Sequence, residues 1–209
     1  MARHAGATGA AIPANILDVA ERLAQTRGFN GFSYAHIAAE VGITTASLHY
    51  HFPTKADLGK ALVARYAKNF QAAIAEIAAS DGDAPERLRR YVQVYQSVLG
   101  KDRMCLCGMF AAEYATLPVA MQEELRQFFD ENERWLVDLL EYGRRLGTLQ
   151  FEGTAREVAG LLTGALEGSM LLARSYGDGT RFSAPVEQLI NSLVCRPAID
   201  RPVGLSGSR

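Results

Sequence analysis

The segment SYAHIAAEVGITTASLHYHFPTKADL, residues 33–58, decides the fold of this chain. Ser33 suits the N-cap of a short helix over residues 34–41, because its side-chain oxygen can accept a hydrogen bond from a free N–H of the first turn. Gly42 then interrupts that helix, and a second short helix is predicted over residues 44–50. Two short helices joined by a tight turn that contains glycine are typical of a helix-turn-helix motif.

The second predicted helix carries a surface that suits the major groove of DNA. Residues 43–51 contain no carboxylate and no lysine, and they offer hydroxyls, imidazoles, a phenol and methyl groups. Hydroxyls can exchange hydrogen bonds with base edges, and the methyl group of Ala46 can contact thymine. Thr44 or Thr45 at the helix start would leave backbone N–H groups free for phosphate. From the spacing alone, two interpretations stand: a DNA-binding motif, or a helical hairpin that only packs.

The segments on either side predict an all-α chain. Apolar residues recur at helical spacing, and no segment shows the sustained alternation of a strand. Capping boxes at Thr54–Asp57 and Thr154–Glu157 mark the starts of two long helices. Further helices are expected over residues 12–27, 85–99, 104–115, 118–147 and 185–194, and the helix from Thr154 should end near Tyr176.

The composition fits a globular chain. Of 209 residues, 48% are hydrophobic and 22% are charged, which argues against disorder. The net charge is −1, so bulk charge gives no argument for a nucleic-acid partner. We expect a helix-turn-helix DNA-binding domain over residues 1–60, a helical ligand-binding and dimerisation domain over residues 61–195, and a loose tail over residues 196–209.

Cysteine usage and hydropathy bear on location. Three cysteines without a recognisable signal peptide predict a reducing, cytoplasmic location. The most apolar stretch, residues 158–173, is too short to span a bilayer and contains Glu167. We therefore expect a buried helix there, and no membrane partner.

Residues 20–62 resemble the tetracycline-repressor-like (TetR/AcrR) family of transcriptional regulators. The residues that carry the resemblance are Ala20–Leu23, Gly28–Phe29, Phe32–Ser33, Ile37–Ala38, Val41–Ile43, Leu48–Phe52 and Thr54–Leu58. The resemblance implies a three-helix DNA-binding head, a homodimer and double-stranded operator DNA as the partner. It implies DNA contacts from Ser33, Tyr34, Thr44, Thr45, Ala46, Ser47, His49, Tyr50, His51 and Lys55.

His49 departs from the family pattern, in which many members carry tyrosine that touches phosphate. Histidine can make the same contact, and protonation would strengthen it. DNA affinity is therefore expected to rise between about pH 8 and pH 6, where histidine titrates. His49 and His51 lie two residues apart and diverge on a helix, so we expect no metal site and no cofactor.

The C-terminal half carries bulky side chains on several helices, and these could line a pocket for a small-molecule effector. The candidate pocket residues are Tyr91, Tyr95, Met104, Cys105, Cys107, Phe110, Tyr114, Phe128 and Trp135. Ordinary core packing is the other interpretation for each of them.

Cys105 and Cys107 form a Cys-x-Cys pair at the expected start of a helix. A helix N-terminus and the nearby Lys101 and Arg103 would favour thiolate, which makes an electrophile or redox sensor the alternative function. A Cys near this position also recurs in a subgroup of the family, although Met104 and Leu106 replace the glycine and proline of that pattern. Buried, inert cysteines are the competing interpretation.

Gly160, Gly164 and Gly168 recur every four residues in the helix from Thr154. Each costs about 1 kcal/mol against alanine in a helix interior, so we expect a close helix–helix approach to offset the cost. The partner is either the same helix of a second subunit or a helix of the same chain. In the family the last two helices form a dimeric four-helix bundle, which implies a dimer interface here that also includes Leu189 and Leu193.

Taken together, these features predict a ligand-responsive regulator, by family analogy a repressor released from a palindromic operator when a small molecule binds. An enzyme is not expected, because residues 61–209 contain no histidine and the chain has neither a Gly-rich phosphate loop nor an HExxH segment. A protein that docks another protein through its helical hairpin is a third possibility.

Overall fold

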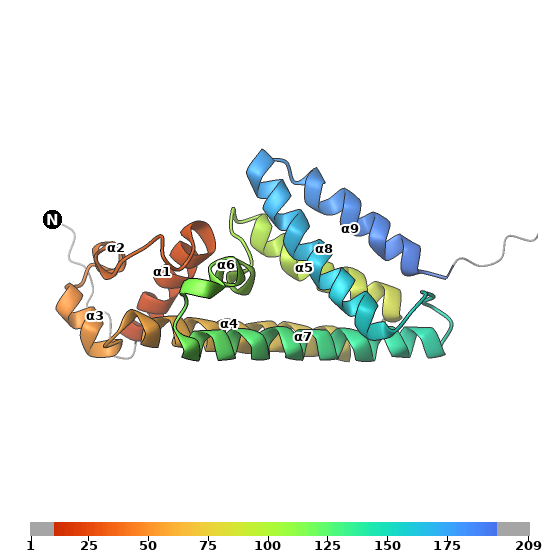
Figure 1. Cartoon of the computed structure of the whole chain (residues 1–209), viewed down its shortest axis with the longest axis horizontal. Helices are drawn as coiled ribbons and strands as arrows, with labels where there is room; N and C mark the ends of the chain where they lie inside the picture. Colours follow the sequence, from red (N-terminus) through yellow and green to blue (C-terminus); the bar gives the residue numbers. More distant parts are fainter. Residues whose placement is uncertain (1–10, 196–209) are drawn as a thin grey trace, which may run out of the picture.

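The computed structural model describes residues 11–195, in which nine α-helices and one 3₁₀ helix are joined by short connections (Figure 1). The helices are α1 (Ala11–Arg27), α2 (Tyr34–Val41), α3 (Thr45–His51), α4 (Lys55–Ala79), α5 (Ala84–Leu99), α6 (Leu106–Ala112), η1 (Tyr114–Thr116), α7 (Val119–Arg145), α8 (Ala155–Tyr176) and α9 (Thr180–Leu193). The only pairing of strand type within this range is a single antiparallel bridge between Leu149 and Val194. The all-α prediction is confirmed, and the predicted tail lies outside the described residues.

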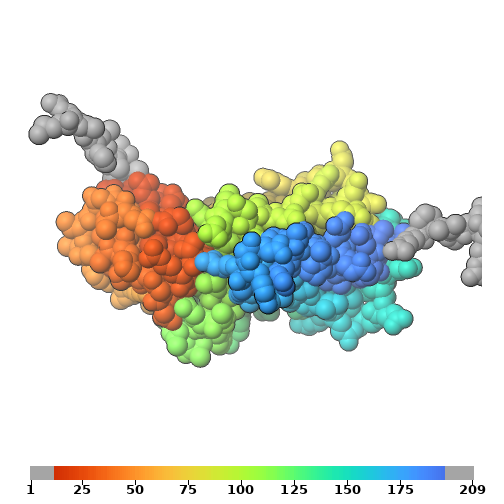
Figure 2. Space-filling model, turned by 90° about the horizontal axis from the view of Figure 1, so that it is seen from above, coloured from red at the N-terminus to blue at the C-terminus, as the bar shows by residue number. Residues whose placement is uncertain are grey.

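The helices form a small head and a larger bundle (Figure 1). The head, α1 to α3, lies at one end, and α4 runs from it along the bundle, packed against α7. Helix α5 packs on α4, α7, α8 and α9, and α6 contacts α1, α4 and α7. Figure 2 shows α8 and α9 together on one long face of the bundle. Helix α4 crosses the predicted domain boundary at residue 60 without a break.

Local capping fixes several helix starts. Thr54 accepts a hydrogen bond from the Asp57 backbone N–H at 3.1 Å, and the Asp57 carboxylate accepts one from the Thr54 N–H at 3.0 Å. Thr154 and Glu157 form the same reciprocal pair at the start of α8. Such pairs satisfy two backbone donors that helix geometry leaves free, which is why both starts could be predicted.

Several predicted boundaries were wrong. Helix α9 begins at Thr180 and not at Pro185, and the Asp178 carboxylate just before it accepts hydrogen bonds from the Thr180 backbone N–H at 3.0 Å and hydroxyl at 2.7 Å. Helix α6 begins at Leu106 and not at Met104, because Cys105 has a non-helical ψ of 126° and is the N-cap, its Sγ accepting from the Gly108 N–H. The Met104 backbone N–H donates to the Gln25 carbonyl of α1 at 3.1 Å.

The head has its own apolar core, and ion pairs between side chains connect it to α4. Ile16, Leu23, Ile37 and Leu48 are fully buried, which locks α1, α2 and α3 together. The Arg65 guanidinium of α4 lies 2.6 Å from carboxylates of both Asp18 and Glu21 in α1. The head is therefore held as one body at the end of the long helix.

Candidate DNA-binding surface and sensing core

Helix α3 presents its polar face to solvent from a fixed base. Leu48 is buried in the head core, whereas Thr45, Ala46 and His49 are exposed and Tyr50 is 85% exposed. The Thr44 hydroxyl accepts a hydrogen bond from the Ser47 backbone N–H at 3.1 Å, so Thr44 is the N-cap. The exposed face lacks carboxylates, and it lies at the tip of the molecule where a duplex could reach it (Figure 1).

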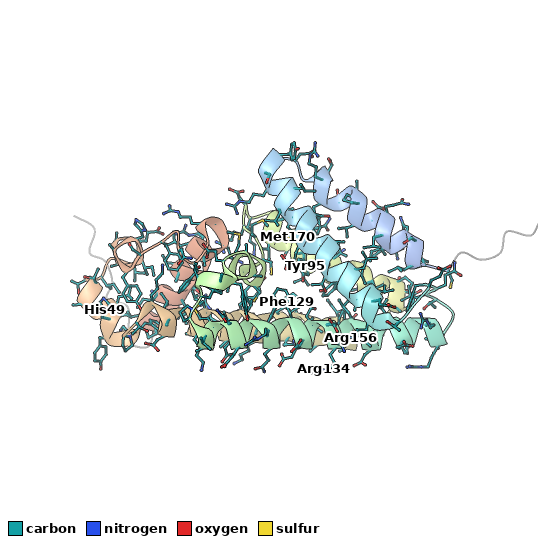
Figure 3. The ribbon with its side chains drawn as sticks, viewed as in Figure 1. His49, Tyr95, Phe129, Arg134, Arg156 and Met170 are labelled. Carbon is teal, nitrogen blue, oxygen red and sulfur yellow. The ribbon has the colours of Figure 1, made fainter. Side chains whose placement is uncertain are left out.

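His49 is oriented by the loop that follows its helix. Its Nδ1 lies 3.0 Å from the Pro53 carbonyl oxygen, and its ring packs on Tyr34 with centroids 4.6 Å apart. A carbonyl only accepts hydrogen bonds, so Nδ1 carries the proton and Nε2 is the acceptor in the neutral ring. Protonation would add a donor at Nε2. Figure 3 shows His49 at the far end of the head, away from the bundle.

Tyr34 stabilises the head through hydrogen bonds to the backbone that follows α3. Its hydroxyl lies within hydrogen-bond distance of two carbonyl oxygens, at 2.8 Å from Phe52 and 2.6 Å from Thr54. Burial raises the pKa of the Tyr34 hydroxyl to about 12, and the Asp57 carboxylate adds to the rise. The phenol therefore stays neutral and ties α2 to the turn before α4.

Lys55 contacts the turn between α1 and α2 through its side chain. Its ammonium donates to the Phe32 carbonyl at 2.6 Å and lies over the Phe29 and Phe32 rings, 4.7 and 4.6 Å from their centroids. Burial lowers the pKa of the Lys55 ammonium, and the Glu113 carboxylate opposes that shift. The Lys55 ammonium thus closes the α1–α2 turn in this structure, and its expected contact with DNA stays a prediction.

Ser33 occupies the predicted N-cap of α2 and is exposed. Its backbone N–H donates to His36 Nδ1 at 3.2 Å. His36 therefore completes a capping arrangement at the start of α2.

Glu113, just after α6, holds the turn between α1 and α2. Its carboxylate accepts hydrogen bonds from the backbone N–H of Phe29 at 2.6 Å and of Asn30 at 3.3 Å. Gly28 has φ +80°, and a Cβ on it would lie 2.6 Å from Glu113 Oε1. Glycine is therefore required here both for the backbone conformation and for the approach of the carboxylate.

Arg174 of α8 holds the end of α1. Its guanidinium donates to the carbonyls of Gln25 at 3.1 Å and Thr26 at 2.6 Å, which are among the free acceptors at a helix C-terminus. Together, Glu113 and Arg174 form the junction between the head and the bundle. Sequence reasoning missed both, because their partners lie 84 and 149 residues away.

The predicted pocket residues divide into two groups. Tyr91, Tyr95 and Phe128 converge on Phe70 of α4, and Trp135 stacks on Tyr91 with ring centroids 5.3 Å apart. The others lie nearer the head. Phe110 packs on Phe29 at 5.5 Å, Met104 pairs with α1 through its backbone, and Tyr114 is half-buried in η1. The first group forms an aromatic cluster in the bundle interior, where Figure 3 labels Tyr95.

A polar chain runs through this aromatic cluster. Tyr91 donates to the Asn132 side-chain oxygen at 3.0 Å, and its hydroxyl lies 3.2 Å from that of Tyr95. Tyr66 of α4 donates to Cys105 Sγ at 3.6 Å. Glu167 of α8 reaches the same region, and burial raises the pKa of its carboxyl to about 7, against the hydrogen bond with Cys105. Glu167 was not among the predicted site residues.

Cys105 and Cys107 do not fit the thiolate interpretation. Both are buried, and burial raises the pKa of each thiol well above its ordinary value; the Glu167 carboxylate adds to the rise. Cys105 does cap α6, its Sγ accepting from the Gly108 N–H at 3.5 Å, but that contact is outweighed. The expected lowering of the thiol pKa at the helix start is wrong.

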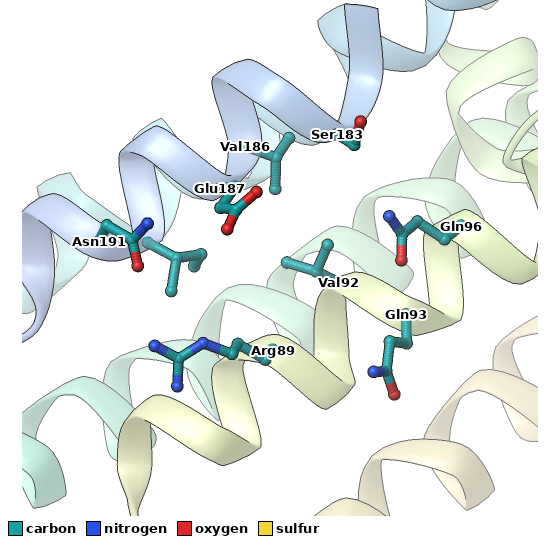
Figure 4. Close-up of a pocket in the computed structure, with 9 residues that line it drawn as sticks. Arg89, Val92, Gln93, Gln96, Ser183, Val186, Glu187 and Asn191 are labelled. Atoms are coloured by element: carbon teal, nitrogen blue, oxygen red, sulfur yellow. The ribbon is translucent and has the colours of Figure 1, made fainter. Parts of the chain in front are cut away.

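Two grooves lie on the surface of the bundle. One, of about 170 Å³, separates α5 from α9 (Figure 4) and is lined by Arg89, Val92, Gln93, Gln96, Ser183, Val186, Glu187, Ile190 and Asn191. The other, of about 240 Å³, includes Trp135 and Tyr142. Of the predicted pocket residues, only Trp135 lines either of these two grooves.

The glycines of α8 face outward. A Cβ added to Gly160, Gly164 or Gly168 would meet nothing within 4 Å, so packing inside the monomer does not explain them. The same helix exposes four large apolar side chains: Leu161, Leu171, Leu172 and Tyr176. Leu193 was expected at an interface, but it is only 5% exposed and belongs to the monomer core, and Leu189 is half-buried against that core.

Within residues 11–195, no helix is long and apolar enough to cross a membrane. In the same range, no group of three or more His, Cys, Asp or Glu residues is arranged to hold a metal ion.

Known proteins match this chain over nearly all of its described length. Residues 16–62 match the model of bacterial regulatory proteins of the tetR family, and residues 84–189 match the tetracyclin repressor-like C-terminal domain. A TetR-family transcriptional regulator from Agrobacterium tumefaciens is 34% identical, with a TM-score of 0.87 over 90% of this chain and 100% of that one. A TetR regulator from Legionella pneumophila is 31% identical, with a TM-score of 0.80 over 91% and 100%. The nucleoid occlusion factor SlmA of Photobacterium profundum is 25% identical over 73% of this chain and 78% of its own length. The chain therefore belongs to the TetR family of transcriptional regulators, with a helix-turn-helix DNA-binding domain at its N-terminus.

Proposed function

We propose that this protein is a repressor that binds a palindromic operator as a homodimer and is released when a small molecule binds the bundle. The observation that carries its DNA-binding part is the exposed, carboxylate-free face of α3, seated on buried Leu48. Thr45, Ala46, Ser47 and Tyr50 would meet base edges, and Ser33, Thr44, His49 and His51 would contact phosphate or flanking bases. Lys55 would contribute through its backbone N–H at the start of α4, since its ammonium is engaged inside the head.

Two copies joined through α8 and α9 would present two heads to one duplex. The outward glycines of α8 permit close approach, and the apolar side chains beside them would leave water on contact. A twofold dimer reads half-sites about 34–36 Å apart or at a related spacing, which matches a palindromic operator.

Effector response would pass through the junction formed by Glu113 and Arg174. Glu113 follows α6 and binds the turn after α1, so a ligand that displaces α6 would shift that turn. Arg174 lies on α8 and binds the end of α1, so a ligand that displaces α8 would shift α1. Operator affinity would fall if the ligand binds more tightly to the displaced arrangement than to the one that fits DNA. Tyr91, Tyr95, Phe128 and Trp135, which converge inside the bundle, are the residues we propose for the pocket wall.

Cys105 and Cys107 do not support an electrophile or redox sensor as a second function. Such a sensor needs a thiol with a lowered pKa, whereas burial raises the pKa of both thiols. A slow reaction with an alkylating reagent at neutral pH is the expected behaviour of such thiols.

The proposed function is tested by DNA binding at a stated salt concentration, using the DNA that flanks the protein's own gene. Thr45→Glu combined with Tyr50→Glu should lower operator affinity at least 100-fold, as two lost contacts and two added repulsions require. Ala75→Glu, on an exposed position of α4, adds a carboxylate away from α3 and is the matched control. If the double variant keeps its helical content and binds as tightly as the control, the proposed function is wrong.

A further inference from the structure

Glu167 is a charged residue inside an apolar helix; the Cys105 thiol is hydrogen-bonded to its carboxyl, but no cation of the described residues pairs with it. It is the single charged residue in residues 158–173. The residue is half-buried overall, but its Oε1 is shut off from solvent and has no hydrogen-bond partner among the described residues. In the same part of the chain, no lysine or arginine forms an ion pair with it. An unpaired buried carboxylate is costly, so its presence points to a partner that arrives from outside.

The titratable groups whose pKa values the Glu167 charge raises supply no positive charge. They are Tyr66 of α4, Tyr91 and Tyr95 of α5, and Cys105 and Cys107 of α6. Burial raises the pKa of each of these five groups, so all are neutral at pH 7. The carboxyl itself, with a pKa raised to about 7, is the group there that can ionise near neutrality. Phenol rings beside a carboxylate attract cations through their faces as well as through the charge.

A second unsatisfied group lies along the same polar chain. Asn132 Nδ2 is buried without a partner, while the Asn132 oxygen accepts the Tyr91 hydroxyl. Tyr91 in turn contacts Tyr95, so the bundle interior holds an unpaired donor at Asn132 as well as the unpaired acceptor at Glu167. A molecule with an ammonium group and an acceptor atom would satisfy both groups.

We propose that the effector is a small protonated amine whose ammonium group pairs with Glu167 among the tyrosines between α4, α5, α6 and α8. This rests on the proposed function, in which a ligand in the bundle controls DNA binding. A neutral or anionic effector would leave the carboxylate unpaired or repelled, whereas an N–H-bearing cation supplies both the charge and the donor that Oε1 lacks.

The position of Glu167 also connects occupancy to the head. A methyl group at Gly108 would collide with the Glu167 carboxylate, so α6 lies directly against it. An amine that shifts the carboxylate would therefore press on α6, and the residue that follows α6 is Glu113, which holds the α1–α2 turn. Binding at Glu167 would thus loosen the head without contacting it.

The test is a fluorescence titration without DNA, using the single tryptophan of the chain as the reporter. Trp135 stacks on Tyr91 and should respond to a ligand beside it. Benzylamine, protonated at pH 8, is compared with benzyl alcohol, which has the same shape and no charge. We expect benzylamine to bind at least tenfold more tightly, and Glu167→Gln to remove that preference while Glu167→Asp keeps part of it.

Glu187→Gln is the matched control, because it removes a carboxylate from the α5–α9 groove (Figure 4). It should keep the preference for the amine. The proposal is overturned if the wild-type protein binds neither probe or binds both equally, if Glu167→Gln with native helical content still prefers the amine, or if Glu187→Gln loses the preference. Operator binding is measured separately in a gel shift, so a failed amine titration with intact DNA binding rejects the effector class and leaves the proposed function standing.

Discussion

The Glu113 carboxylate accepts a hydrogen bond from the Phe29 backbone N–H at 2.6 Å, which joins the end of the α6 region to the turn that precedes the helix-turn-helix. The same carboxylate reaches the Asn30 N–H, and Gly28 beside it leaves the space that the carboxylate occupies. One side chain of the bundle thus satisfies two backbone donors of the head. Motion of α6 therefore acts directly on the α1–α2 turn.

Glu113→Ala should lower the free energy of unfolding by about 1–3 kcal/mol, because it leaves the Phe29 N–H without its charged acceptor. Denaturant unfolding measures the loss, and amide hydrogen exchange should speed up at Phe29 and Asn30. Glu123→Ala, on an exposed position of α7, is the control and should change stability by less than about 0.5 kcal/mol. Equal effects of the two substitutions would show that Glu113 does not hold the turn.

His49→Ala should lower operator affinity about tenfold, because it removes a ring that is held by the Pro53 carbonyl through Nδ1 and leaves Nε2 for a contact with phosphate. Fluorescence anisotropy with labelled operator at constant salt would measure the change. Gln127→Ala, on an exposed position of α7, is the control and should bind as the wild-type protein does. If His49→Ala binds as tightly as this control, His49 makes no contact with the operator.

Leu172→Glu should convert the dimer to a monomer, because it places a charge on the outward apolar face of α8, where Leu172 is 52% exposed. Val119→Glu is the matched control, since Val119 is 67% exposed but lies at the start of α7. Sedimentation or light scattering distinguishes the two states. A Leu172→Glu protein that stays dimeric would contradict an interface on α8.

Glu167→Gln should change how stability depends on pH. The pKa of this carboxyl is raised to about 7 in the fold from 4.5, so the folded state binds more protons than the unfolded state between those values. Wild-type stability should therefore fall, relative to the variant, as pH rises through this window, by on the order of 3 kcal/mol in total. The other groups that face Glu167 stay neutral throughout. Urea unfolding at pH 4.5, 6 and 8 provides the comparison, and a constant difference between the two proteins would contradict the raised pKa.

The parts of the fold that depend on neighbouring residues could be predicted from the sequence. Thr54 and Thr154 cap helices through residues three positions away, and the breaks at Gly42 and Gly177 follow from left-handed backbone that favours glycine. Helix α9 shows the limit of this approach, because Pro185 indicated a helix start whereas the helix begins at Thr180, whose N–H donates to the Asp178 carboxylate.

The parts of the site that depend on distant segments could not be predicted. Nothing near Lys55 in sequence indicates that the Phe29 and Phe32 rings and a carbonyl hold its ammonium. Likewise, the Arg174 guanidinium reaches the Gln25 carbonyl only because folding brings these distant segments together. Glu167 is different, because it is a lone charge within residues 158–173 and the sequence alone shows it. An isolated charge on a buried helix argues against a membrane span, and it is also a sign of a binding group.

The hold that Glu113 and Arg174 exert on α1 bears on how such regulators can be recombined. A chimera that transplants residues 1–60 onto a foreign sensing half would carry the DNA-reading surface but leave behind both side chains that grip it. To keep its effector response, a working hybrid would need a carboxylate and a guanidinium at equivalent places in the new bundle. Residues 1–60 can therefore be transferred as a responsive unit only together with residues equivalent to Glu113 and Arg174.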